Sequence, residues 1–314
     1  MNIISGNSIE EMVDYSFGDQ AGVLMGIPGA FMNKANEENK HFLNWCLLSN
    51  LDKPLALFVD NIRLYKRPIV HNPVDKVWID KLQEEDLLDL CSKMPNDFII
   101  YTSHEDTPID EYIKNRIPPN VLKIYATNAI YNDDKVIPFP YGLQRKMNFE
   151  DKRIEIMEDF IEMQTLEHNG NIKPEYLLYI NCGLGSERNA PERAFLPHFE
   201  QYDWATCRFN KDSMHFPHKF YNFFLSELVN HKFVICPQGH GIDCHRNWET
   251  LYVRRVPVMK KSPYFSRLMQ DFPVLFVDRW EDVTEELLAQ NDHLYKQALE
   301  MDLTKLDLNK YEAR

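Results

Sequence analysis

The second half of the chain alternates short apolar runs with helix-like segments at a regular spacing. The apolar runs between residues 176 and 277 are YLLYIN, WATC, KFVIC, VPVM and PVLFV. Helix-like segments separate them, among them Pro217–Asn230, Asp243–Val253 and Trp280–Gln290. Because parallel strands need a crossover of a dozen or more residues between them, this spacing predicts βαβ units and a doubly wound parallel sheet.

The first half carries similar apolar runs with less regular, proline-rich joints. They are AGVLMGIPG, PLALFVD, DFIIYTS, VLKIYATN and KVIPFPYGL, with helix-like segments at 39–49 and 80–93. A charged stretch then loses its pattern, which predicts a linker or boundary between Leu143 and Lys173. A length of 314 residues suits two domains. We therefore expect domains at residues 1–147 and 148–295, with a C-terminal helix at about 296–314 that packs back on the first domain.

Composition argues against several classes of protein. The net charge of -13 repels polyanions, so we expect no nucleic-acid binding and no attraction to anionic membranes. The six cysteines are sparse and lie mostly in apolar runs, which favours buried, reduced thiols over a disulfide framework. The N-terminus lacks the pattern of a signal peptide, and no apolar run is long enough to span a membrane. We expect a soluble, cytoplasmic protein.

One stretch, from Lys232 to Met259, concentrates polar and reactive groups between two apolar runs. Its loop would lie at the carboxyl edge of the sheet, where open α/β sheets bind ligands. Gly239 and Gly241 let a ligand approach the backbone, and Asp243 can cap the helix that follows. The free amides at the start of that helix attract phosphate. Arg246 and Glu249, three residues apart on one helix face, could clamp a diphosphate and accept ribose hydroxyls.

Two other interpretations of this stretch stay open. Residues 231–267 contain seven Lys or Arg against two acidic residues, which suits an anionic ligand but also an ordinary solvated basic face. The second alternative is a zinc site. Its ligands would be Cys236, His240, Cys244 and His245, although their spacing lacks the paired form that zinc sites prefer.

The string CPQGHGIDCHRNWETLYVRRVPVM resembles the donor-site signature of exostosin-like glycosyltransferases. That signature is Cys/Ser-Pro-x-Gly-x-Gly-x-Asp-x-His-Arg-x-Trp-Glu followed by Pro-Val, in a family with soluble viral and bacterial members. The likeness is dense over Phe233–Val258 and thinner over about 175–290. Upstream, YTSHEDTPI and VIPFPYGLQ resemble loops of the N-terminal domain of such enzymes.

The resemblance implies a GT-B fold, in which two Rossmann-like domains face a cleft. It implies that the C-terminal domain binds a nucleotide-sugar donor and that the N-terminal domain binds a glycan acceptor. UDP is the commonest nucleotide of the donors in this family. The implied donor-site residues are Gly239 and Gly241 at the phosphates, His245 and Asp243 around the sugar phosphate, Arg246 at the diphosphate and Glu249 at the ribose. The sequence departs from the family at Arg254 and Arg255, where small residues and glycine are common.

A second basic loop, NCGLGSERNAPER, follows the strand at 176–181. Arg188 and Arg193 could complete a diphosphate clamp, or they could be ordinary surface arginines. Arg208 ends the next strand and could lie near the nucleobase.

Inverting sugar transfer needs a base for the acceptor hydroxyl and stabilisation of the departing diphosphate. Arginines and a helix N-terminus supply the second, and the chain has no Asp-x-Asp motif, so we expect neither a metal nor a cofactor. The base should come from a strand end of the N-terminal domain. The candidates, in order, are Asp106 with His104 and Glu105 beside it, and then Asp60. A non-catalytic nucleotide- or glycan-binding module is the alternative, and a phosphate hydrolase ranks last because GxxxxGK[ST] and GxSxG are missing.

Overall fold

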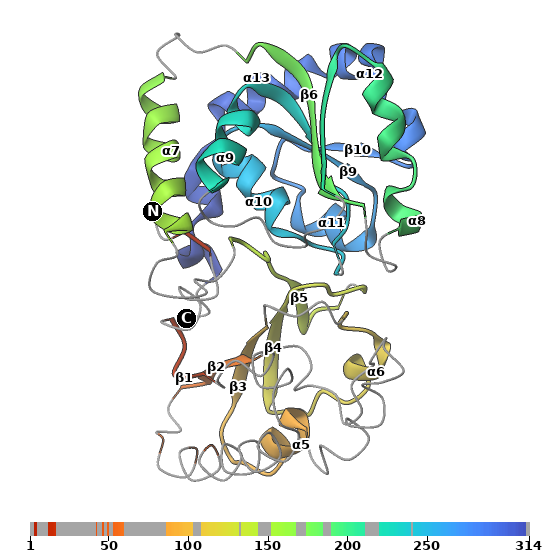
Figure 1. Ribbon diagram of the computed structural model, residues 1–314. Helices are drawn as coiled ribbons and strands as arrows, with labels where there is room; N and C mark the ends of the chain where they lie inside the picture. Colours follow the sequence, from red (N-terminus) through yellow and green to blue (C-terminus); the bar gives the residue numbers. More distant parts are fainter. Residues whose placement is uncertain are drawn as a thin grey trace. The chain divides into compact units, whose positions relative to one another are not determined.

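The computed structural model divides the chain into two compact units. Unit 1 comprises residues 1–7 and 140–311, and unit 2 comprises residues 8–139 and 312–314. The structure describes residues 3–4, 12–16, 42, 46, 49, 53–59, 86–102, 108–131, 133–143, 152–167, 174–184, 190–210, 220–239 and 241–311. Each unit is an α/β structure built on a parallel sheet, as the sequence predicts (Figure 1).

Unit 2 has five strands that pair in chain order, all parallel. They are β1 (Tyr15–Ser16), β2 (Leu55–Val59), β3 (Phe98–Thr102), β4 (Val121–Ala126) and β5 (Val136–Pro138). The described helices are α5 (Leu87–Ser92) and α6 (Glu111–Lys114). Four of these strands fall in predicted apolar runs. The remaining apolar run of the first half, AGVLMGIPG, lies outside the described residues.

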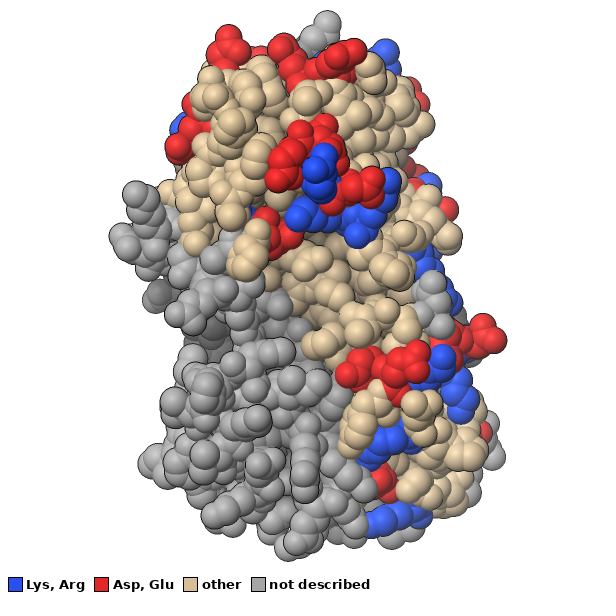
Figure 2. Space-filling view, turned by 90° about the vertical axis from the view of Figure 1, so that its right-hand side faces the viewer, with Lys and Arg blue, Asp and Glu red and all other residues tan. Residues whose placement is uncertain are grey.

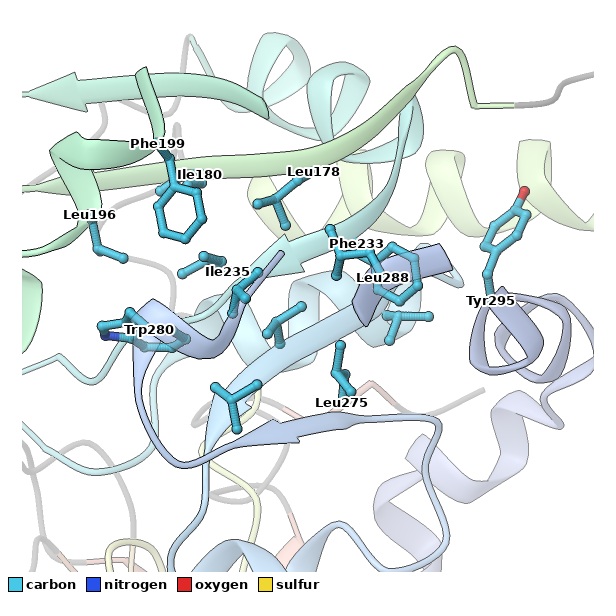
Figure 3. Close-up of a cluster of buried hydrophobic side chains, with 14 of the residues drawn as sticks. Leu178, Ile180, Leu196, Phe199, Phe233, Ile235, Leu275, Trp280, Leu288 and Tyr295 are labelled. Atoms are coloured by element: carbon cyan, nitrogen blue, oxygen red, sulfur yellow. The ribbon is translucent and has the colours of Figure 1, made fainter. Parts of the chain in front are cut away.

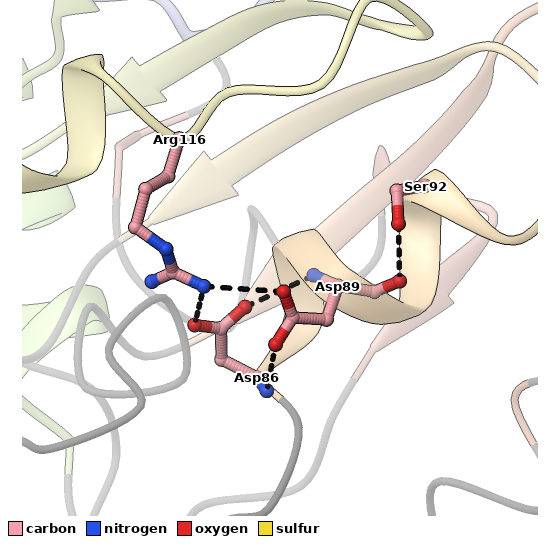
Figure 4. Close-up of polar contacts among 4 residues, drawn as sticks. All are labelled: Asp86, Asp89, Ser92 and Arg116. Carbon is pink, nitrogen blue, oxygen red and sulfur yellow. Dashed lines mark hydrogen bonds and ion pairs between the residues drawn. The ribbon is translucent and has the colours of Figure 1, made fainter.

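A buried ion pair fixes the start of α5 in unit 2 (Figure 4). Asp86 and Asp89 form a capping box, in which each carboxylate accepts the backbone N–H of the other residue. Arg116 forms ion pairs with both carboxylates, and its Nη2 lies 3.3 Å from Asp89 Oδ1. The Asp86 side chain is fully buried, and burial raises its pKa from the ordinary value. The arginine therefore compensates a desolvated carboxylate.

Unit 1 has a second five-stranded parallel sheet, in the order β10-β9-β8-β6-β7. Its strands are β6 (Tyr176–Gly183), β7 (Ala205–Asn210), β8 (His231–Ile235), β9 (Val256–Lys260) and β10 (Leu275–Val277). Its helices are α7 (Arg153–Glu167), α8 (Ala190–Arg193), α9 (Tyr221–Val229), α10 (His245–Tyr252), α11 (Pro263–Leu268), α12 (Glu285–Gln290) and α13 (Asp292–Glu300). Short 3-10 helices are η2 (Leu196–Gln201), η4 (Trp280–Asp282), η5 (Leu303–Leu306) and η6 (Leu308–Tyr311).

The strand order of unit 1 reverses between β6 and β8. The chain moves outward from β6 to β7 and then crosses back to β8 on the other side of β6. Loops that leave neighbouring strands in opposite directions open a crevice at the carboxyl ends of those strands, where α/β proteins bind ligands. In unit 1 this crevice lies between Gly183, at the end of β6, and Cys236, just after β8.

Alternation along the strands explains why helices cover both faces of this sheet. Leu178 and Ile180 of β6 point into a core with Trp280 of η4, Leu288 of α12 and Tyr295 of α13 (Figure 3). Tyr179, between the two β6 residues, points to the other face, where its ring packs 6.5 Å from Phe224 of α9. The inner strands β6, β8 and β9 are largely buried on both sides, which is why their sequences are mostly apolar, whereas the edge strand β7 is partly exposed.

The division into units differs from the predicted domains in two places. First, the stretch expected to be a linker forms α7, whose buried face carries Met157, Phe160 and Gln164 at helical spacing. The apolar residues of α7 are spread around the helix, and Met163 among them is exposed, so the periodic pattern in the sequence is weak. Second, the C-terminal stretch belongs to unit 1, where Tyr252 Oη donates to the carbonyl of Leu306 at 3.0 Å.

None of the helices in the described part of the chain is both long enough and apolar enough to cross a lipid bilayer. Most other predicted elements of unit 1 occur close to their expected bounds. The segment Trp280–Gln290, expected to be one helix, is split into η4 and α12.

We predict that Arg116→Met destabilises unit 2 by about 2–4 kcal/mol, because it leaves Asp86 buried without its cation. Urea unfolding followed by circular dichroism measures the change. Arg279→Met is the matched control, since Arg279 and Asp282 form an exposed pair at 2.8 Å and its loss should leave stability unchanged. Equal effects of the two substitutions would contradict this account.

Candidate functional site

The loop from β8 to α10 is organised around the buried carboxylate of Asp243, which is 2% exposed. Its two oxygens accept hydrogen bonds from several elements of unit 1. The donors are Tyr141 N at 3.0 Å, Cys244 N at 2.8 Å, Asn247 Nδ2 at 2.7 Å, Trp248 Nε1 at 3.1 Å and Tyr264 Oη at 3.1 Å. Asp243 therefore holds the loop together, and its part in shaping a sugar-phosphate pocket stays a prediction.

The predicted helix cap is also displaced by one residue. The N-cap of α10 is Cys244, whose side chain makes no capping hydrogen bond. Burial is the main cause that raises the pKa of Asp243 to about 6, and the hydrogen bonds that it accepts oppose the shift. Asp243 accepts from Cys244 N and Asn247 Nδ2, and Asn247 N donates to the Cys244 carbonyl at 3.1 Å. In the first helical turn this leaves the N–H groups of His245 and Arg246 without a partner among the described residues.

His245 and Asp243 together fix the segment Pro140–Leu143, with which the chain enters unit 1. His245 Nδ1 donates to the Gly142 carbonyl at 2.8 Å, and its ring packs 4.5 Å from that of Tyr141. Burial lowers the pKa of His245 to about 4, so the ring is neutral at pH 7. Gly142 has a φ of +67°, and a Cβ there would lie 2.3 Å from the Ile4 carbonyl oxygen. The histidine of the His-Arg pair in the signature string therefore makes a structural contact.

Four backbone amides at the switch point have no hydrogen-bond partner within the described part of the chain. They are the N–H groups of Gln238, Gly239, His245 and Arg246. The first two lie in the loop after β8, and the last two begin α10. A Cβ on Gly239 would meet no atom closer than 3.7 Å, so packing does not require glycine there. Clustered free amides at a helix start form a site for an anion.

Arg246 is the cation of this site. Its guanidinium lies over the ring of Phe224 at 5.7 Å, and its Nε is buried without a hydrogen-bond partner among the described residues. No side-chain hydrogen bond or ion pair joins it to any residue that the structure describes. A desolvated arginine with unused donors is suited to a diphosphate.

Arg193 has a different environment. Its Nη1 donates to the Gly183 carbonyl at 2.6 Å and its Nη2 to the Gln238 carbonyl at 2.7 Å. It therefore bridges the exits of β6 and β8 at the switch point. Burial lowers its pKa from the ordinary value.

Glu249 lies one turn after Arg246 and is 8% exposed. Burial raises its pKa, while the charge of Arg246 and a hydrogen bond from Tyr221 of α9 oppose the shift. The carboxylate is thus held between α10 and α9, beside Arg246. Its role at a ribose stays a prediction.

The remaining candidates have varied positions. Arg208 is exposed on the edge strand β7, with its Nη2 3.4 Å from Glu227 Oε2. Gly241 is buried in the loop before α10. Five candidates lie outside the described residues, namely Arg188, His104, Glu105, Asp106 and Asp60.

Most of the basic residues that suggested an anion site have structural partners. Lys232, Lys260 and Lys261 form ion pairs with Asp292, Glu192 and Asp278. On the face drawn in Figure 2, basic and acidic side chains lie beside one another. The charge excess therefore gives little support to an anion site, because most of these side chains are paired. Arg246 has no side-chain hydrogen bond or ion pair among the described residues.

The two arginines that depart from the family pattern are also structural. Arg254 follows α10 with a φ of +56°, a conformation that glycine adopts most easily. Its Nη1 donates to the Leu299 carbonyl at 2.7 Å and to the Met301 carbonyl. Arg255 is 1% exposed and donates to the Val229 carbonyl through Nε at 3.0 Å. Neither fact changes the anion site.

No group of three or more His, Cys, Asp or Glu among the described residues is arranged to hold a metal ion. Of the four ligands considered for zinc, His240 lies outside the described residues. The other three are engaged. Cys236 Sγ contacts Thr250 Oγ1 at 3.7 Å, Cys244 Sγ lies 3.3 Å from Asn247 Oδ1, and His245 donates to Gly142.

Comparisons with known proteins gave likenesses to solved structures alone. No protein-family model matches the chain, and no curated protein matches it. Among solved structures, the chain is similar to a crystal structure of an alpha1,3-fucosyltransferase, with 13% sequence identity and a TM-score of 0.36. The likeness covers 86% of this chain and 78% of that chain. A likeness this distant says nothing about the residues or the reaction of this chain, and membership of the exostosin-like family stays a prediction.

Two neighbouring groups in this site have opposite effects on stability at acid pH. The pKa of Asp243 is about 6, above its ordinary 3.8, so its contribution is greatest at low pH and is lost as the pH rises through about 6. The pKa of His245 is about 4, below its ordinary 6.5, so its contribution is present at neutral pH and is lost as the pH falls to about 4. Between these values the two contributions offset one another.

We predict that His245→Asn removes the contribution of His245 to the pH dependence of stability. Asparagine keeps an N–H for the Gly142 carbonyl but does not titrate. The free energy of unfolding of the variant, relative to that of the unmodified chain, should rise by about 2–3 kcal/mol between pH 7 and pH 4.5. Urea titrations at the two pH values measure it. A difference that does not change with pH contradicts the assignment.

A pair of glycine substitutions separates packing from ligand access. Gly142→Ala should destabilise unit 1 by about 2–4 kcal/mol, because the new Cβ clashes with backbone and the φ is positive. Gly239→Ala should change stability by less than about 0.5 kcal/mol, because its Cβ has room. Thermal unfolding of both variants measures the two changes in stability. Comparable losses would show that packing requires glycine at position 239.

Proposed function

We propose that the chain is a glycosyltransferase that takes a sugar from a nucleoside diphosphate donor, with a UDP sugar as the first candidate, and passes it to a hydroxyl of a glycan. The diphosphate binds at the switch point of unit 1, between the exits of β6 and β8. Unit 2 supplies the acceptor-binding surface and the base. Transfer proceeds with inversion and without a metal ion.

The observation that carries this proposal is a set of polar donors that have no partner among the described residues. They are four amides, two in the loop after β8 and two at the start of α10, and the Arg246 guanidinium. Desolvating such donors is costly unless a ligand satisfies them. An anion with several oxygens, such as a diphosphate, matches both their number and their charge.

The same donors suit the chemistry of the transfer. Negative charge builds up on the diphosphate as the glycosidic bond breaks, and preorganised donors stabilise that charge without having to reorganise. Glu249 lies a turn further along α10 and would accept the ribose hydroxyls. The acceptor hydroxyl needs a base, for which Asp106 is the first candidate.

We predict that Arg246→Met lowers the affinity for the donor nucleotide by about 30- to 100-fold, because it removes a desolvated phosphate contact worth about 2–3 kcal/mol. Arg246→Lys should recover part of the loss. Calorimetry with UDP and an assay for UDP release from UDP sugars measure binding and turnover. Arg279→Met, an exposed arginine remote in sequence from the signature, is the control.

Gly239→Ala provides an independent test of the same site. If a phosphate approaches this backbone closely, the added methyl group should weaken nucleotide binding at unchanged stability. Unaltered binding and turnover in both Arg246→Met and Gly239→Ala would refute the assignment. Tight nucleotide binding without turnover on any donor would instead identify a non-catalytic binding module.

A further inference from the structure

The short helix α8 is held firmly against the sheet of unit 1. Lys260 Nζ, at the end of β9, lies 2.8 Å from Glu192 Oε2, and Trp280 Nε1 donates to the Glu192 carbonyl at 2.9 Å. Arg193 is the next residue. These contacts place its guanidinium between the Gly183 and Gln238 carbonyls, to which it donates at 2.6 and 2.7 Å. The contacts that hold α8 therefore fix the position of Arg193.

Fixing a carbonyl also fixes the amide that follows it. In a trans peptide the C=O of one residue and the N–H of the next point in opposite directions. Because the Gln238 carbonyl turns toward Arg193, the Gly239 N–H turns away from it. The preceding peptide is held in the same way, since Cys244 Sγ donates to the Pro237 carbonyl at 3.6 Å, which turns the Gln238 N–H outward.

We infer that Arg193 is a positioning residue, which builds the anion site by orienting backbone amides and does not act as a second arginine on the diphosphate. This inference rests on the proposed function. Arg193 engages the negative ends of two peptides that would otherwise repel a phosphate. It thereby turns the Gly239 N–H, and the amide after Gly183, away from its own guanidinium. Successive outward amides of this kind form an anion-binding nest.

This role differs from a direct contact in a way that can be measured before any ligand is added. If Arg193 orients the peptide, its removal changes the environment of the Gly239 amide in the free protein. If Arg193 only touches the phosphate, the Gly239 amide of the free protein is unaffected. Arg246 has no such link to the loop backbone through its guanidinium among the described residues.

The experiment uses the full chain labelled with 15N-glycine, which gives signals from the 11 glycines. Gly239→Ala identifies the Gly239 signal by its disappearance. In Arg193→Met without ligand, we expect the Gly239 signal to be displaced or broadened while the Gly142 signal stays in place. Arg193→Lys, which can still donate to one carbonyl, should give a smaller change. Arg246→Met should leave the free Gly239 signal unchanged.

Titration with inorganic pyrophosphate completes the test. In the unmodified chain pyrophosphate should shift the Gly239 signal, and Arg193→Met should weaken its binding by about tenfold or more. Weaker binding with an unchanged free Gly239 signal would overturn the positioning role in favour of direct contact. Unchanged binding in Arg193→Met would overturn any role. If the unmodified chain binds neither pyrophosphate nor any nucleotide, the proposed function itself fails, which is distinct because no variant is involved.

Discussion

The buried carboxylate of Asp243 is the interaction on which the architecture of unit 1 depends most. Placing a carboxylate in an apolar interior is costly, and here the cost is offset by donors from three separate parts of unit 1. Those parts are the segment at Tyr141, the helix α10 with its N-cap, and Tyr264 of α11. Because one side chain satisfies all of them, the loop after β8 has one arrangement and the chain enters unit 1 at a fixed place.

The same arrangement explains why polar residues can lie between buried strands. Asp243 and His245 face inward and hold the protein, whereas the amides of the loop and of the first helical turn are left for a ligand. Arg193 and Arg246 differ in the same way, since Arg193 holds the protein and Arg246 is left for a ligand. One has two carbonyl partners at the strand exits, and the other has unused donors over an aromatic ring. The signature therefore combines residues that build the site with residues that can bind at it.

Sequence reasoning recovered the parallel α/β sheets because alternating apolar runs and helical segments are local patterns. It also predicted that the loop from β8 to α10 lies at the carboxyl edge of the sheet, since a strand, a glycine loop and a helix imply such an edge. It could not assign Asp243, because the donors to that carboxylate come from residues up to 102 positions away. Arg193 was expected to touch phosphate for the same reason, as its carbonyl partners follow from folding alone. The helix α7 was missed because apolar residues spread around a helix give a weak periodic signal.

The central claim is that the unused donors at the switch point exist for a diphosphate. Calorimetric titration of the unmodified chain with uridine, UMP and UDP, and with the other nucleoside diphosphates, tests it most directly. The account predicts that affinity rises at each added phosphate and that at least one diphosphate binds with a Kd in the micromolar range, on the order of −8 kcal/mol. Equal affinity for nucleoside and diphosphate, or no binding at millimolar concentration, would contradict it.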